Sequence, residues 1–252
     1  MKLAVGLLTA SCAIFSLNGH AADTDKLQTA AGIQQVTVVG SDAQSGIKYK
    51  KGDVELQIDW PRVISVEVAE PAELKAARAA YDAAKTDSSK WANVAVAFQP
   101  IMDKYPRLPT RWAEDATLAL IEASAGAGKA ADAQAWLSKF QTWYPRSPRL
   151  LTAVAGLAKG LVSAKRYDDA IKLIEEATKT KRDLLAVSEE DGKTLGLALN
   201  ALGDAYEQKG VLDKALDAYL ATKILYYHDP AALKIATEKC EALKPRVAIL
   251  GR

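Results

Sequence analysis

Residues 33–68 alternate between apolar and polar side chains, which is the period of a β-strand with one buried face. The clearest run covers residues 54–60, and shorter runs cover 36–38, 47–49 and 64–68. We therefore expect four short antiparallel strands that share one apolar face and form a small β-domain at 32–70.

Two connections in this segment are also readable. The tripeptide Lys51-Gly52-Asp53 is typical of a hairpin turn, because glycine tolerates the positive φ that such turns require. A longer loop is expected at 40–46. A sheet of this size buries too little surface to be stable alone. We expect the helix that begins after Pro71 to cover it, since proline is favoured in the first helical turn.

The remainder, 71–250, is predicted to be helical and repetitive. The phrase Tyr-Pro-Arg-x-Pro occurs at 105–109 and again 39 residues later at 144–148, and such recurrence indicates an array of similar units. Four segments align on a small or β-branched residue, namely Val94, Ala133, Ala170 and Ala215. Large apolar residues stand four positions later in each segment: Phe98, Leu137, Ile174 and Tyr219.

These columns predict four pairs of antiparallel helices, at about 74–108, 113–147, 151–184 and 196–229. Gly128 and Gly210 stand at equivalent turns, where a left-handed residue ends the first helix of a pair. Ser188 is predicted to cap the first helix of the last pair. Asp229 opens a further helix, expected at 230–244, which would cover the apolar end of the array.

The first 21 residues read as a targeting segment. Lys2 precedes an apolar run that ends at Leu17, and small residues lead to Ala21, which is typical of a secretory signal peptide at 1–21. An alternative makes Cys12 the acylated cysteine of a lipoprotein. We expect an exported protein of the periplasm or cell envelope, associated with a membrane only if Cys12 is lipidated.

Composition then removes several classes of function. The 33 Lys+Arg and 31 Asp+Glu give a formal charge of only +2, which does not indicate a nucleic-acid surface. Cys240 and His228 are the only cysteine and histidine after the signal peptide, so we expect no disulfide scaffold, metal or cofactor. No nucleophile–base set is identifiable, and we predict that the chain is not an enzyme. Four tryptophans are expected mainly in the core rather than in a ligand cage: Trp91, Trp112, Trp136 and Trp143.

Residues 199–219, Leu-Asn-Ala-Leu-Gly-Asp-Ala-Tyr-Glu-Gln-Lys-Gly-Val-Leu-Asp-Lys-Ala-Leu-Asp-Ala-Tyr, resemble the tetratricopeptide repeat family in their Leu-Gly, Tyr, Gly, Ala and aromatic positions. Residues 166–171 are a second good match, and the resemblance covers roughly 72–229. The family's unit is 34 residues, whereas the spacings here are 39, 37 and 45. The repeated Tyr-Pro-Arg-x-Pro phrase is similar to that of exported, periplasmic bacterial members. The resemblance implies a mainly α fold: an α-solenoid of about four helix hairpins with a C-terminal capping helix, behind a small N-terminal antiparallel sheet.

The resemblance also implies a groove lined by the first helix of each pair. Its positions here would be Asp115, Leu118, Glu122, Lys159, Asn200, Asp204 and Glu207. Acids outnumber bases among them, so we expect a protein or peptide partner with basic and apolar groups, bound in an extended or helical form. The alternative is a structural or accessory subunit of an envelope assembly, docked through the β-domain. The sequence alone leaves the identity of the partner and the oligomeric state open.

Overall fold

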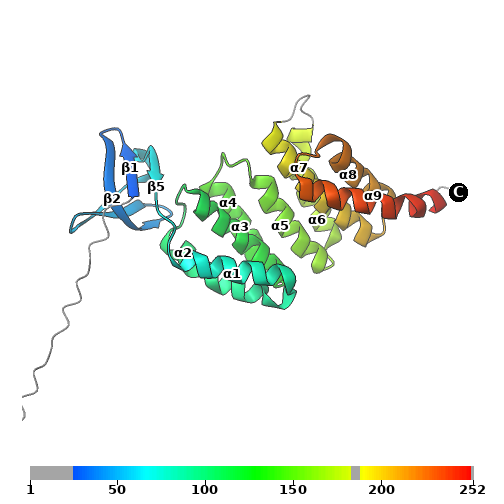
Figure 1. The fold of residues 1–252 in the computed structure, drawn as a ribbon, viewed down its shortest axis with the longest axis horizontal. Helices are drawn as coiled ribbons and strands as arrows, with labels where there is room; N and C mark the ends of the chain where they lie inside the picture. Colours follow the sequence, from blue (N-terminus) through cyan, green and yellow to red (C-terminus); the bar gives the residue numbers. More distant parts are fainter. Residues whose placement is uncertain (1–24, 183–187, 251–252) are drawn as a thin grey trace, which may run out of the picture.

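A computed structural model describes residues 25–182 and 188–250. The predicted signal peptide, with Cys12, lies outside the described residues. In the part described, a five-stranded antiparallel sheet is followed by nine α-helices, so the chain is mainly α, as expected. The sheet lies at one end of the molecule and the last helix at the other (Figure 1).

The strands are β1 (Asp25–Thr29), β2 (Gly32–Asp42), β3 (Gly46–Lys51), β4 (Val54–Ile58) and β5 (Ser65–Glu67), in the spatial order β4-β3-β2-β1-β5. The four expected strands correspond to β2–β5, and the Gly52 turn has the expected positive φ of 59°. Strand β1 was not predicted, because its sequence Asp-Lys-Leu-Gln-Thr has only one apolar residue. It pairs with both β2 and β5, so Leu27 is buried between them.

One face of the sheet is apolar, as expected, but its cover differs from the prediction. Inward-facing residues of every strand are buried: Leu27, Val36, Val38, Ile47, Ile58 and Val66. The helix after Pro71 was expected to cover the sheet. The contacts come instead mainly from the end of helix α2 and from the residues that follow it, 105–112. Val54 and Leu56 of β4 stay 59% and 40% exposed.

The helices are α1 (Glu73–Thr86), α2 (Trp91–Lys104), α3 (Arg111–Gly126), α4 (Ala130–Trp143), α5 (Leu150–Ser163), α6 (Tyr167–Arg182), α7 (Glu189–Lys209), α8 (Leu212–Leu225) and α9 (Pro230–Leu250). These helices overlap the four predicted pairs, but the last pair begins at Glu189, before the expected residue 196. Helix α9 continues past Pro245, beyond the expected end of the last helix at 244.

Burial confirms the sequence columns. The four aligned small or β-branched residues are all fully buried, and so are the large residues four positions later: Val94, Ala133, Ala170, Ala215, Phe98, Leu137, Ile174 and Tyr219. At Gly203, an added Cβ would lie 2.6 Å from the ring of Tyr219. The small residue is therefore needed where α7 and α8 approach each other.

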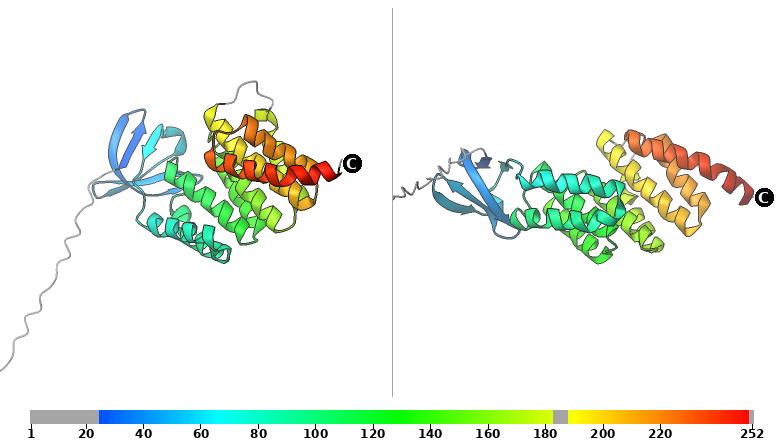
Figure 2. Two further views of the ribbon diagram at one scale, coloured as in Figure 1. Left: turned by 45° about the vertical axis from the view of Figure 1, so that its right-hand side comes forward. Right: turned by 60° about the horizontal axis from the view of Figure 1, so that its bottom comes forward.

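The odd-numbered helices form a row. Helix α3 contacts α5, α5 contacts α7, and α7 contacts α9, while each also packs on the even-numbered helices next to it in the chain. Figure 2 shows the row from two further sides. Trp112 and Trp136 lie in this core, as expected, and Cys240 is fully buried on α9.

The helix ends follow the predicted chemistry. Ser188 accepts a hydrogen bond from the Asp191 amide, and Asp229 accepts one from Ala232, so both act as N-caps. Gly128 and Gly210 have φ of 75° and 86°. The equivalent turn between α5 and α6 places Lys165 in the same left-handed conformation, at φ 60°.

Candidate binding groove

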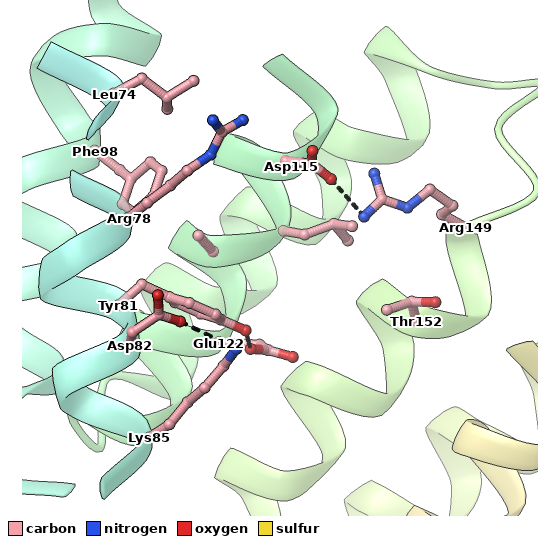
Figure 3. A pocket seen from close by; sticks show the side chains of 12 residues that line it. Leu74, Arg78, Tyr81, Asp82, Lys85, Phe98, Asp115, Glu122, Arg149 and Thr152 are labelled. Carbon is pink, nitrogen blue, oxygen red and sulfur yellow. Dashed lines mark hydrogen bonds and ion pairs between the residues drawn. The ribbon is translucent and has the colours of Figure 1, made fainter. Parts of the chain in front are cut away.

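A cavity of about 320 Å³ lies between α1, α3 and α5 (Figure 3). Helix α1 contributes Arg78 and Tyr81, α3 contributes Asp115 and Glu122, and Arg149 enters from the start of α5. Apolar side chains, including Leu74, Phe98 and Leu118, form the rest of its wall. The cavity therefore combines an apolar lining with charged groups from three helices.

The charged groups of this cavity are held in place by one another. The Tyr81 hydroxyl donates a hydrogen bond to the Glu122 carboxylate. Burial of the ring and the adjacent Glu122 charge raise the pKa of Tyr81 well above its usual value, so the hydroxyl remains a donor. Arg149 is only 15% exposed, and its Nη2 lies 2.6 Å from an Asp115 oxygen (Figure 3).

Two further cavities continue from the first. The second shares Tyr81, Lys85 and Glu122 with it and extends to Trp91 and Lys159. The third shares Lys159 and Ser163 with the second and reaches α7 at Ala201 and Asp204. We call this connected series across α1, α3, α5 and α7 the inner groove.

Glycines allow the helices under the middle of the inner groove to pack closely. A Cβ on Gly160 would lie 2.2 Å from that of Ala125, and one on Gly156 would lie 2.8 Å from Cγ of Glu122. Helices α3 and α5 therefore approach each other at these points. Gly126 lies against the Trp91 ring in the same way. Trp91 is half-buried: it packs against the hydrophobic core and also lines the groove.

The seven residues predicted for the groove separate into two groups. Asp115, Leu118, Glu122 and Lys159 line the inner groove, and Asp204 lies at its far end. Asn200 and Glu207 do not line it. The Asn200 amide is buried and donates to the Ala232 carbonyl, while Glu207 binds Lys239 at 2.7 Å, and both partners belong to α9.

The packing of α9 against α7 explains this correction. Lys239 reaches Glu207 from the expected part of the helix, and Arg246 reaches it because the helix continues past residue 244. Glu207 is left with a side-chain exposure of 17%. Burial lowers the pKa of Lys239, but its hydrogen bond to Glu207 and the charges of Asp204 and Glu207 outweigh this, and the pKa is raised. Lys239 therefore stays charged and neutralises acids that the prediction had assigned to a ligand.

Sequence reasoning missed several lining residues, among them Arg78, Lys85, Arg149 and Lys165. Lys165 had a usable signal, because it stands five residues before Ala170, where the equivalent turns have Gly128 and Gly210. Arg149 had none, since only the folded chain brings it to Asp115.

No protein-family model matches this chain, and no curated protein is significantly similar to it. Among the described residues, no helix is both long enough and apolar enough to span a bilayer. The same residues contain no group of three or more His, Cys, Asp and Glu placed to hold a metal ion.

Proposed function

We propose that this chain is a non-enzymatic interaction scaffold of the bacterial cell envelope, exported by its N-terminal segment. In this proposal, the helices form an α-solenoid of the tetratricopeptide repeat type, with α9 as its cap. The inner groove binds an extended segment of a partner protein. The buried repeat columns and the row of odd-numbered helices support the architecture, and the sequence resemblance supports the family.

The observation that carries the binding function is the continuity of the inner groove. Its three cavities share side chains in succession and cross four helices. A small-molecule site is usually one enclosed pocket, whereas a peptide in a repeat protein runs across several units. Polar groups of the groove can hydrogen-bond a peptide backbone: Thr152 lines the first cavity, and the Ser163 hydroxyl, which donates to the Lys159 carbonyl, can still accept a hydrogen bond.

Site-specific photo-crosslinking in cells tests this function. A photoreactive residue at Thr152 or Ser163, inside the groove, is expected to capture one and the same partner protein. The matched control is the exposed Gln141 on α4, which lines none of the three cavities. Equal crosslinking of the partner from Gln141, or no crosslinking from either groove position, would reject the groove as the binding site.

A second candidate function is docking through the sheet. Strand β4 is an edge of the sheet, and it presents Val54 and Leu56 to solvent. An exposed apolar edge strand is a place where another chain can add a strand. If this is the docking site, Leu56→Lys should abolish binding of the chain to its partner assembly, and a photoreactive residue at Thr152 should crosslink to no partner.

A further inference from the structure

The charges of the inner groove divide into those that are neutralised within the protein and those that are not. Arg78 donates two hydrogen bonds to Glu70, at 2.6 and 2.7 Å. Asp115 is paired with Arg149. These groups have little charge left to attract a ligand, because each pair has almost no net field at a distance.

At the α7 end of the groove, the charge of Asp204 is neutralised by side chains that do not line the groove. Asp204 accepts a hydrogen bond from the Tyr219 hydroxyl at 2.6 Å and lies 3.6 Å from Lys239 Nζ. At the opposite end of the groove, on α1, Lys85 lies 3.5 Å from Asp82 and over the Tyr81 ring. The excess of acid expected from the sequence is therefore absent from the folded groove.

Two lysines of the groove remain unpaired. Lys159 and Lys165 are exposed, and neither has an ion-pair partner among the residues that the structure describes. Both line the third cavity, and Lys159 also lines the second, beside Trp91. Among the described carboxylates that line the second and third cavities, Glu122 alone has no ion-pair partner, and it accepts a hydrogen bond from the Tyr81 hydroxyl. The net unpaired charge of this part of the groove is positive.

Lys165 is held there at a conformational cost. Its amide donates to the Val162 carbonyl, and the next amide donates to Leu161. The turns at Gly128 and Gly210 repeat this pair of hydrogen bonds, so the three turns are equivalent. A non-glycine residue in the left-handed region is strained by about 1 kcal/mol. The chain thus places an amine at the groove where glycine would fold more easily, which is typical of a functional position.

We propose that the occupant of the inner groove is an acidic segment of the partner protein. Its carboxylates bind Lys159 and Lys165, and a neighbouring apolar side chain enters the second cavity beside Trp91. This inference rests on the proposed function and adds the chemistry of the partner. Charge complementarity of this kind selects the partner and speeds its association more than it adds affinity.

Peptide titrations with the purified chain test the proposal. The probes are two labelled synthetic peptides, three repeats of Glu-Leu-Asp-Phe and three repeats of Lys-Leu-Arg-Phe, measured by fluorescence anisotropy. The acidic peptide is expected to bind, and the basic peptide to bind at least about tenfold more weakly. Raising the ionic strength from about 0.02 M to about 0.5 M should weaken the acidic peptide severalfold, because salt screens exposed charges.

Variants then locate the contact. Lys159→Glu with Lys165→Glu should weaken the acidic peptide by about tenfold or more. The matched control reverses Lys75 and Lys234 to Glu, since these exposed lysines of α1 and α9 lie outside the groove lining. The control should leave affinity within about twofold.

Lys165→Gly separates binding from folding. It should weaken the acidic peptide severalfold and raise the melting temperature by about 2–4 °C, because glycine relieves the left-handed strain. A loss of affinity in a more stable protein is not explained by unfolding.

Several results would overturn the proposal. The basic peptide could bind more strongly than the acidic one, or neither peptide could bind. The Lys75/Lys234 control could lose as much affinity for the acidic peptide as the groove variant does. Self-association of the chain could also displace the acidic peptide. If the groove still captures a partner in cells, these results reject only the acidic occupant. Silence from Thr152 and Ser163 would instead reject the groove function itself.

Discussion

The two copies of the Tyr-Pro-Arg-x-Pro phrase end their helices in the same way but serve different neighbours. In the first copy, the Pro106 carbonyl accepts a hydrogen bond from Ser41 at 2.7 Å, and Arg107 donates to the Ala43 carbonyl at 3.1 Å. Leu108 is fully buried. The first copy therefore joins the helices to the sheet.

The second copy meets a helix instead of a sheet. Ser147 donates to Glu114 at 3.1 Å, and Arg149 pairs with Asp115, so this copy braces α5 against α3 and completes a wall of the inner groove. Pro145 and Arg146 stay exposed. Proline therefore ends the helix in both copies. The contacts of the residues after it depend on the neighbouring element, which is the sheet for the first copy and α3 for the second.

The largest expected effect comes from truncating two equivalent buried residues, Trp112 after the first copy and Leu151 after the second. Truncation to alanine should cost about 3–5 kcal/mol at Trp112 and about 2–5 kcal/mol at Leu151. Of the two, only Trp112 donates to the segment directly after β5, through Nε1 to the Val68 carbonyl at 3.0 Å. Urea unfolding measures the cost, and hydrogen exchange of β5 should rise only in Trp112→Ala. Equal exchange in Leu151→Ala would remove the distinction between the copies.

Asp25 provides the next largest test, because it ties the sheet to the chain that leads into α1. Its buried carboxylate accepts hydrogen bonds from the Val38 and Ala69 amides, at 2.8 and 2.9 Å. Asp25→Ala should cost about 2–3 kcal/mol, since the buried Val38 amide and the part-buried Ala69 amide both lose their acceptor. Asp25→Asn should cost less, because the amide retains one acceptor. The exposed Asp59→Asn is the control, expected within about 0.5 kcal/mol in the same urea titration.

The arginines of the two phrases give a smaller, matched pair. Arg107 lies over the Trp60 ring at 5.1 Å and has φ 60°, while Arg146 is exposed. Arg107→Ala should cost about 1 kcal/mol and Arg146→Ala almost nothing. Arg107→Gly should be more stable than Arg107→Ala by about 1 kcal/mol, because glycine accepts the left-handed conformation. Thermal unfolding that ranks all three variants equally would contradict the role of the first copy in docking.

Much of the fold was predictable because its signals are local. Strands β2–β5 alternate, the repeat columns are buried, and Gly128 marks its turn through its freedom at positive φ. Strand β1 was missed because long-range pairing, and not its own pattern, makes it a strand. The cover of the sheet was misassigned for a related reason, since Ser41 and Pro106 meet only in the folded chain.

The candidate site was less predictable, because its charges depend on partners far away in the sequence. Asp115, Glu122 and Lys159 line the cavities, at positions predicted from the repeat geometry, and their contact with a partner stays a prediction. Glu207 does not line them, since Lys239 and Arg246 of α9 pair with it in the folded chain. Counting acids along the sequence therefore gave the groove a charge that the ion pairs of α9 largely remove.

The smallest expected effect concerns Glu70, in the segment that joins the sheet to α1. The hydrogen bonds from Arg78 lower the pKa of Glu70 below its usual 4.5. The stabilisation is therefore fully present above about pH 4.5 and is lost as the pH falls through the lowered value. Both side chains are about half exposed, so the effect should not exceed about 0.5 kcal/mol.

Glu70→Gln isolates this effect, because several other exposed acids also have lowered pKa values. The difference in unfolding free energy between the native chain and Glu70→Gln should shrink as the pH falls from about 6 towards 3. Arg78→Gln should give the same pH dependence, since it removes the other half of the pair. A difference that stays constant across this range would mean that the ion pair contributes nothing to the junction between the sheet and α1.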